Sequence, residues 1–354
     1  MNLFVVGYYA FLIGSSCLAA YYKQRTAFLL LFSLTLASFV MGIVGGRPAL
    51  LTVTGFAAML ALAAGTSYAF REFLVIIAPT ETAKALRTCP LTASFGLFVV
   101  FTYAIMGIFA PLIAPYGEAE VITEAFAPAD ENMLLGADQL GRDMFSRIVY
   151  GARNTVGLAL LATILAFVMG ALAGLFAATK GGWFDQIMGR VADVIMSVPS
   201  LIFALLMLSI FGTNLFVLVI IIAIIYSPRV YRLARAVAGN VVVMDYIEAA
   251  RLRGEGTWYL IRKEILPNSS APLVAEFGLE FCFVFLLVAG LSFLGLGIQP
   301  PTADWGSMVR ENATLISFGE LMPLIPAAAI ALLTVAVNFV VDWMLFRSSG
   351  LKEQ

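Results

Sequence analysis

Long apolar windows separated by short polar segments dominate the chain. A helix needs about 20 apolar residues to cross the hydrocarbon core of a bilayer, and windows of that size recur along the whole sequence. Residues 194–228 carry no charge over 35 positions, which is too long for one crossing, so Phe211-Gly212-Thr213-Asn214 predicts a turn between two helices. The pattern predicts nine membrane-spanning helices, in residues 1–22, 26–46, 48–70, 91–114, 154–179, the two halves of 194–228, 272–296 and 321–346.

The first window has a second interpretation. Residues 1–22 are also compatible with a cleaved signal peptide, because Ala19-Ala20 offers a cleavage-like site, but no basic region precedes the apolar run. That absence favours a retained helix. We expect four polar segments to connect the helices. They are a connector at residues 71–90, an outer loop at residues 116–151, a short turn at residues 180–193 and a second outer loop at residues 299–320.

The longest well-charged segment, residues 240–272, lies between two apolar windows. Its first part has few β-branched residues and predicts a short helix that Gly254 breaks. A second helix is expected to follow, with Thr257 as its N-cap, and to end at Pro267, because proline is unfavourable in a helix interior. A polar helix-turn-helix between two membrane helices is suited to docking a soluble partner.

The distribution of basic residues predicts the orientation of the chain. With residues 240–272 placed in the cytoplasm, 16 Lys and Arg residues lie on the cytoplasmic side and five on the outer side. An odd number of crossings then puts the N-terminus outside and the C-terminus in the cytoplasm. The five outer basic residues are Arg47, Arg142, Arg147, Arg153 and Arg310.

Composition supports the membrane assignment and excludes several functions. Of the 354 residues, 61% are hydrophobic and 12% charged, whereas a soluble domain has about a quarter charged residues. The net charge of −1 argues against a nucleic-acid partner. The sequence contains no histidine, which removes imidazole bases and Ser-His triads. The cysteines show no metal or redox spacing, so we expect no metal site; they are Cys17, Cys89 and Cys282.

The charged segment resembles the EAA loop of bacterial ABC importer permeases. The matching residues are Glu248-Ala249-Ala250, then Gly254, then Ile265-Leu266-Pro267-Asn268. In that family the loop, here at about residues 240–270, is cytoplasmic and forms a coupling helix that docks on the ATPase subunit. The resemblance therefore implies ATPase-coupling roles for Glu248, Ala249, Ala250, Gly254, Leu266 and Pro267.

Two further segments resemble signatures of the dipeptide, oligopeptide and nickel branch of these permeases. The first runs from Leu135 through Gly141-Arg142-Asp143 to Arg153, with Ala137 where the branch usually has Thr. Its charges either pair with one another or face a docked protein. The second runs from Leu291 to Gly306, and its Trp305 suits a membrane interface. The outer-face residues that we expect to contact the binding protein or form a gate are Asp138, Arg142, Asp143, Arg147 and Trp305.

Two carboxylates lie four residues apart in the window 272–296, on one helix face. A carboxylate in the hydrocarbon region is costly and usually faces a cavity or a partner. Glu276 is expected at the cytoplasmic interface, paired with Arg262 or Lys263. Glu280 lies deeper, and we regard it as a possible pathway residue.

The resemblance implies an all-α membrane protein with a six-span, type I ABC importer permease core in residues 88–354, preceded by about three extra transmembrane helices and a connector in residues 1–87. It implies an OppC/DppC-like permease of the inner membrane, importing peptides with an OppB/DppB-like second permease, two cytoplasmic ATPases and an extracytoplasmic binding protein. The chain has no G-xxxx-GK-[ST] phosphate-binding loop. It is therefore expected to bind no cofactor and to be no enzyme, with ATP and Mg²⁺ used by the partner ATPases.

Three alternatives remain open. Within the same branch, the cargo could be nickel or another small solute. In a different class, an ion-gradient-driven secondary transporter would be expected to show inverted repeats and ionisable residues near the middle of the membrane. We find no repeat, and most windows lack charge. A membrane-embedded enzyme would need a nucleophile or metal constellation that the sequence does not offer.

Overall fold

The computed structural model describes residues 53–318 and 322–348, together with four isolated positions before residue 53. The described part is helical, and its only β-structure is two isolated bridges. The chain divides into two compact units, Met1–Val99 and Val100–Gln354. The first two predicted membrane helices lie outside the described residues. The third corresponds to α3 (Val53–Ile77), which α4 (Thr80–Arg87) follows.

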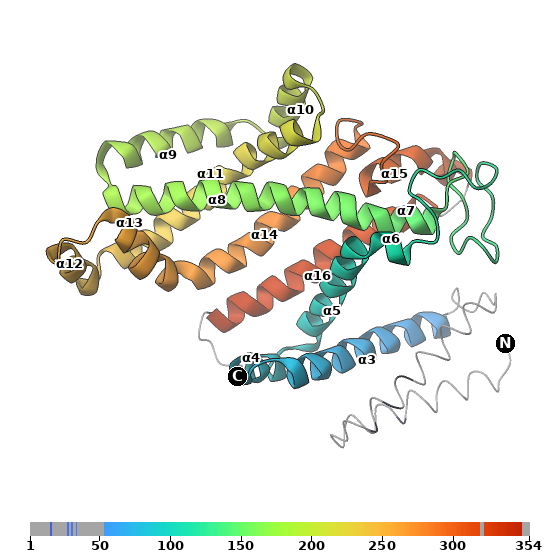
Figure 1. Cartoon of the computed structure of the whole chain (residues 1–354), viewed down its shortest axis with the longest axis horizontal. Coiled ribbons are helices and arrows are strands. Elements are labelled where there is room, and N and C mark those ends of the chain that lie inside the picture. The colour runs from blue at the N-terminus through green and yellow to red at the C-terminus, as the bar shows by residue number, and fades with distance from the viewer. Residues whose placement is uncertain are drawn as a thin grey trace. The chain divides into compact units, whose positions relative to one another are not determined.

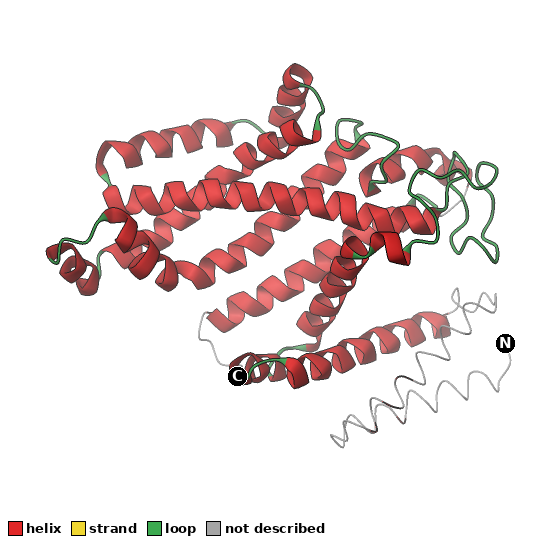
Figure 2. Cartoon of the chain, viewed as in Figure 1, coloured by secondary structure: helices red, strands yellow, loops and turns green. Residues whose placement is uncertain are grey.

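The core spans predicted from the apolar windows are confirmed in number and order, with one of them bent (Figures 1 and 2). One helical pair, α9 (Gly182–Ser197) and α10 (Ser200–Phe211), is bent by 90°. Among the described residues, five other helical runs are long and apolar enough to cross a membrane, namely Leu91–Ile108, Met144–Lys180, Leu215–Val242, Thr257–Phe293 and Leu324–Arg347.

Helices α8 (Gly157–Lys180) and α11 (Leu215–Val242) pack along their lengths in the second unit. Small residues make this possible. A Cβ atom on Gly170 would lie 2.7 Å from Cβ of Val230, and one on Gly174 would lie 2.6 Å from the backbone oxygen of Tyr231. Because real Cβ atoms do not approach so closely, the Gly-xxx-Gly spacing sets the distance between these two helices.

The prediction of a short turn in residues 180–193 is wrong. Residues 182–193 belong to α9, a 16-residue amphipathic helix whose polar side resembles a loop in sequence, and only Gly181 separates it from α8. The chain bends instead at Pro199, which precedes α10. The second predicted turn is confirmed: Gly212 ends α10 with φ +83°, and the side chain of Asn214 caps α11 by accepting from the backbone N–H of Phe216.

The charged segment forms α12 (Asp245–Leu252), as predicted, and Gly254 ends it with φ +86°. Thr257 is not the N-cap of the next helix, because Gly256 takes that position. Pro267 does not end that helix either. Helix α13 (Thr257–Tyr259) leads through a π-helical segment, η3 (Leu260–Ile265), into α14 (Leu266–Phe293).

The π-helical segment explains how proline is tolerated there. Pro267 stands in the first turn of α14, directly after η3. In a first turn the missing N–H of proline removes no α-helical hydrogen bond, and the wider π-helical turn before it changes the pattern of backbone bonds. The membrane helix therefore extends beyond the expected start at Pro272 and is continuous with the charged segment.

Within the second unit, α12 lies at one end of the long helices and α7 (Met144–Gly151) and α15 (Trp305–Asn312) lie at the other (Figure 1). The last helix, α16 (Leu324–Ser348), packs against α14 and α15. The EAA-like segment therefore lies at the opposite end of the same bundle from the two further signatures. The predicted boundary between residues 87 and 88 stays a prediction.

Candidate functional site

Helix α12 is held to the bundle by one buried face. Ile247 and Ala250 are fully buried in a cluster that also contains Leu175 of α8, Val241 of α11 and Ile265 of η3. Three separate membrane-spanning runs therefore contribute to the seat of α12. Because packed cores deform little, a displacement of α12 is expected to move these helices with it.

The opposite face of α12 is open. Glu248 and Ala249 are exposed, and the apolar side chain of Leu252 at the C-terminal end is 84% exposed. Tyr246 and Val243 are also exposed. Exposed apolar side chains at the tip of a polar loop are typical of a surface that a protein partner covers.

Two contacts fix the end of α12 and the loop beyond it to α8. The guanidinium group of Arg251 donates to the backbone oxygen of Thr179 at 3.3 Å. The ring of Trp258 stacks on that of Phe176, with centroids 6.0 Å apart and planes at 18°. The loop is thus anchored on both sides of Gly254, which itself has open space around it.

The other residues assigned to coupling differ in exposure. Ala250 is buried and contacts this chain's own helices, so its small size permits close packing inside the bundle. Leu266 and Pro267 are exposed at the beginning of α14. Of the six residues, five therefore have exposed positions and one has a buried position.

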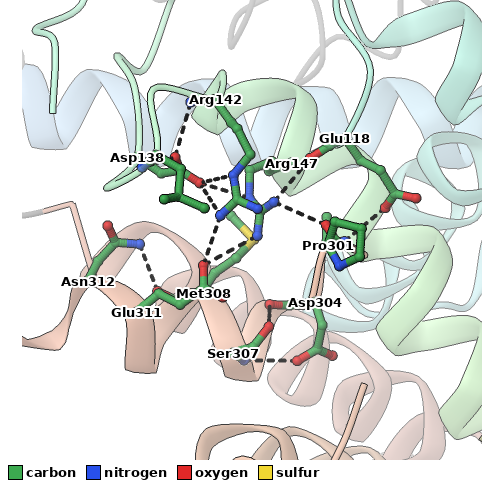
Figure 3. A network of polar contacts seen from close by, with 12 residues as sticks. Glu118, Asp138, Arg142, Arg147, Pro301, Asp304, Ser307, Met308, Glu311 and Asn312 are labelled. Carbon is green, nitrogen blue, oxygen red and sulfur yellow. Dashed lines mark hydrogen bonds and ion pairs between the residues drawn. The ribbon is translucent and has the colours of Figure 1, made fainter. Parts of the chain in front are cut away.

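The end of the bundle that carries α7 and α15, which we name the outer end after the orientation predicted from the sequence, holds a buried cluster of four charges (Figure 3). Arg142 contacts Asp138 at 2.7 Å and Glu311 of α15 at 3.2 Å. Arg147 contacts the same two carboxylates at 3.2 and 3.4 Å. The four side chains are between 1% and 8% exposed. Two positive and two negative charges balance, as buried ionic groups require.

The cluster joins three segments that are distant in the sequence. Arg147 also donates to the backbone oxygen of Glu118 at 3.0 Å (Figure 3). The Glu118 carboxylate accepts from the side chain of Asn154 at 2.9 Å and from the backbone N–H of Ala303 at 2.8 Å. The outer loop, the start of the α8 run and the segment before α15 are therefore bonded together.

Asp143 has a local role. Its carboxylate caps α7 by accepting from the backbone N–H of Ser146 at 2.8 Å and from its hydroxyl at 2.6 Å. Burial of Asp138, Arg142, Asp143 and Arg147 favours the internally paired interpretation of the first outer signature over direct contact with a docked protein.

The second outer signature contains a similar buried anchor. The Asp304 carboxylate caps α15, accepting from the backbone N–H of Ser307 at 2.9 Å, and accepts from the hydroxyl of Thr155 at 2.8 Å. Burial raises the pKa of this carboxyl group, against the opposing effect of the hydrogen bonds that it accepts.

The expectation that Trp305 lies at the membrane interface is wrong. Its side chain is fully buried, donates from Nε1 to the backbone oxygen of Ile148 at 3.0 Å, and packs edge-on against Tyr103 and Phe285. An interfacial tryptophan would present its ring to the headgroups. Here the polar N–H is satisfied inside the protein, so the ring fills the core of the outer end.

Glu280 is buried in α14, and its Oε2 atom has no hydrogen-bond partner among the described residues. Glu276 is partly exposed one turn earlier. In the described part of the chain Glu276 forms no ion pair, so the expected pairing with Arg262 or Lys263 is not observed. The nearby cation is Arg229 of α11, which acts electrostatically on both carboxylates and stacks on the rings of Tyr226 and Phe283.

Several residues of these sites were missed by sequence reasoning. Glu311 completes the charged cluster, Glu118 bonds to Asn154 beside it, and Thr155 holds Asp304. Nothing in the local sequence marks Glu311 or Thr155, because their bonding partners lie more than 100 residues away along the chain. The local charge balance gives no signal either, because Asp138 and Asp143 already match Arg142 and Arg147 in number.

The comparisons with known proteins define the class. Residues 169–348 match the family described as binding-protein-dependent transport system inner membrane component. The chain is 34% identical over 254 residues to the di/tripeptide transport system permease protein DppC of Pseudomonas aeruginosa (strain UCBPP-PA14), covering 70% of this chain and 84% of that protein. It is 33% identical over 258 residues to the probable D,D-dipeptide transport system permease protein DdpC of Escherichia coli (strain K12), covering 73% and 86%.

The chain therefore belongs to the family of binding-protein-dependent transport system inner membrane components. It is the multi-pass permease subunit of an ABC importer, which confirms the resemblance found in the sequence. Among solved structures it is similar to a chain of the inward-facing methionine ABC transporter MetNI, with 16% identity, a TM-score of 0.47, and 58% of this chain and 97% of that chain covered.

Proposed function

We propose that this permease imports peptides. Its relatives in Pseudomonas aeruginosa and Escherichia coli are named for the transport of di- and tripeptides and of D,D-dipeptides, and this supports a peptide cargo. It forms half of the translocation path, and a second, OppB/DppB-like permease forms the other half. An extracytoplasmic binding protein delivers the cargo, and two cytoplasmic ATPases use ATP and Mg²⁺. Nickel or another small solute is the alternative cargo.

In this proposal the α12 end of the bundle faces the cytoplasm and the charged cluster faces outward. The excess of basic residues on the α12 side supports that orientation, and so does the position of the EAA-like segment at the opposite end of the second unit from the two further signatures. The N-terminus is then outside and the C-terminus in the cytoplasm of a bacterial or archaeal cell.

The exposed face of α12 docks on an ATPase subunit. Glu248 and Ala249 make the contact, Gly254 sets the bend after α12, and Ala250 packs inward and transmits the movement. Closure of the ATPases on ATP pushes α12 and, through the buried cluster around Ile247, turns the permease pair outward; hydrolysis restores the inward-facing state. This is alternating access by differential stabilisation of two states.

The buried residues at the outer end hold the rim against which the binding protein docks. Asp138, Arg142, Asp143, Arg147 and Trp305 then act by positioning the outer loop rather than by touching the partner. Glu280, which has an unsatisfied oxygen atom inside the bundle, is proposed as a pathway residue that becomes accessible in another state of the cycle.

The coupling proposal rests on the two faces of α12. One face is buried against three helical runs, and the other face is exposed. The test compares two glycines of the loop, both with open space around them. Gly254 has φ +86°, which β-branched residues do not tolerate, whereas Gly256 has φ −77°. Gly254→Val therefore distorts the loop and Gly256→Val does not.

Both variants are reconstituted with the two ATPases, the second permease and the binding protein, and ATP-dependent uptake of a labelled dipeptide is measured. We expect Gly254→Val to reach the membrane at the normal level and to lose at least tenfold in uptake, and Gly256→Val to retain most of it. Normal uptake by Gly254→Val would contradict the coupling role. Uptake of nickel but of no peptide by the unmodified complex would support the alternative cargo.

A further inference from the structure

Helix α9 presents two chemically different faces. Trp183, Ile187, Val191 and Val194 follow one another at helical spacing and are 45–69% exposed, as expected of a face that contacts lipid. The polar residues of the same helix lie on another side. They are Asp185, Gln186, Gly189, Arg190 and Asp193. One face of α9 is thus suited to lipid, and the other is not.

The polar side of α9 forms one wall of an open cleft of about 630 Å³. The other wall is α11, which contributes Tyr231, Arg232 and Arg235. Two ion pairs cross the cleft, Asp193 with Arg232 and Asp185 with Arg235. Both arginine side chains are about half exposed, at 52% and 50%, so the ion pairs are open to the space beside the helices.

The depth of these charges decides what they face. Helix α11 has 28 residues, and is therefore about 42 Å long at about 1.5 Å per residue, longer than the roughly 30 Å hydrocarbon core. Placing the core centrally on this helix leaves about 6 Å outside it at each end. Arg232 and Arg235, about 26 and 30 Å along the helix from Leu215, then lie in the cytoplasmic half of the core. Charged groups at that depth face a water-filled space or a partner, not lipid.

We propose that this cleft between α9 and α11 is part of the aqueous translocation path, in its cytoplasmic half. The inference rests on the proposed import function and goes beyond it by assigning residues to the path. Charges of both signs suit a cargo that carries both an ammonium and a carboxylate group. Arg190 has no ion-pair partner in the described part of the chain, so the lining has a net charge of +1 from three arginines and two aspartates.

The test uses single cysteines on the two faces of α9, in a background with Cys17, Cys89 and Cys282 replaced by Ala. Gln186→Cys places a thiol on the cleft, and Val191→Cys places one on the apolar face; both positions are exposed and neither forms an ion pair. The complete importer in inside-out vesicles is treated with a charged, membrane-impermeant methanethiosulfonate reagent. Modification of this chain is followed with time.

We expect Gln186→Cys to react at least tenfold faster than Val191→Cys. Dipeptide and binding protein are enclosed in the same vesicles, and ATP added outside drives release of the dipeptide, which is the import direction in this orientation. Modification at Gln186→Cys should lower this release at least tenfold, because the attached group obstructs the path. Equal rates, an unreactive Gln186→Cys covered by the second permease, or full release after complete modification would each overturn the proposal. Release before modification separates the two inferences: a complex that transports no peptide in its unmodified form refutes the import function itself.

Discussion

The hydroxyl group of Thr155 donates a hydrogen bond of 2.8 Å to the carboxylate of Asp304, which lies 149 residues further along the chain. The same hydroxyl oxygen accepts from the backbone N–H of Trp305 at 3.1 Å. Thr155 belongs to a π-helical turn, η2 (Ala152–Val156), that precedes α8, and Asp304 is the N-cap of α15. One buried hydroxyl group therefore joins the beginning of the membrane-spanning run that contains α8 to α15, the helix that follows α14.

Replacing this hydroxyl should destabilise the outer end. In Thr155→Val the N–H of Trp305 and one oxygen of Asp304 lose their partner while remaining buried, at a cost of about 1–3 kcal/mol. Thr163→Val is the matched control. Thr163 is also buried, but its hydroxyl donates only to the backbone oxygen of Ala159 in its own helix. We expect the thermal midpoint of the detergent-solubilised protein to fall for Thr155→Val alone; equal midpoints would contradict the role of this bond.

The buried Asp304 should make stability depend on pH. Burial raises its pKa above the ordinary value of 3.8. The folded state therefore binds a proton more tightly than the unfolded state, so the stability that this group contributes is complete below the unfolded pKa and is lost as pH rises through the folded pKa. Asp304→Asn cannot titrate. The thermal midpoints of both proteins are measured across the acid range. The difference between the midpoint of the wild type and that of Asp304→Asn should shrink as pH rises, and a difference that grows in favour of the wild type would refute the assignment.

The stability of the outer charge cluster should depend more on the balance of its buried charges than on any single contact. Arg147→Met leaves two buried carboxylates with only Arg142, and breaking a buried pair typically costs about 3–5 kcal/mol. Adding Glu311→Gln restores neutrality, so the double variant should regain part of the lost stability. Thermal midpoints and the amount of folded protein in the membrane measure both effects.

Arg153→Met supplies the control for that cluster. Arg153 lies six residues after Arg147, is exposed, and has no hydrogen-bond or ion-pair partner among the residues that the structure describes. Its replacement should change the midpoint little, since isolated surface charges contribute little to stability. If Arg153→Met were as damaging as Arg147→Met, the effect would come from charge at the membrane surface and not from the buried pairs.

The course of the core helices could be predicted from sequence because a membrane crossing requires a long apolar window, and such windows are visible without knowledge of tertiary contacts. Helix α9 was missed for the same reason. Its charged residues Asp185, Arg190 and Asp193 share one side of the helix, and a window average cannot distinguish a polar helix face from a polar loop. The continuation through Pro267 was missed because the π-helical turn before it has no sequence signal that we could recognise.

The candidate sites were predictable to the extent that they are local. Helix α12 and the bend at Gly254 depend on neighbours in the chain, and both were anticipated. The partners of the outer charges depend on tertiary structure: Glu311 meets Arg147 across 164 residues. The burial of Trp305 likewise follows from Tyr103 and Phe285, which no local pattern connects to it.

The contact between α8 and α11 provides the last test. In Gly174→Ala the new Cβ atom would lie 2.6 Å from the backbone oxygen of Tyr231 and 2.8 Å from Cβ of Ala234, so the helices must move apart. Overpacking of this kind typically costs about 1–3 kcal/mol. Gly157→Ala is the control, because the same helix begins there with nothing within 4 Å of the added atom.

Because alanine favours a helix more than glycine does by about 1 kcal/mol, Gly157→Ala should keep or raise the thermal midpoint. Gly174→Ala should lower it, and should also lower uptake, since α8 and α11 support α12 through Leu175 and Val241. The midpoint of the solubilised protein and dipeptide uptake by the reconstituted importer are the measurements. An unchanged midpoint for Gly174→Ala would mean that the two helices are not in close contact in the membrane.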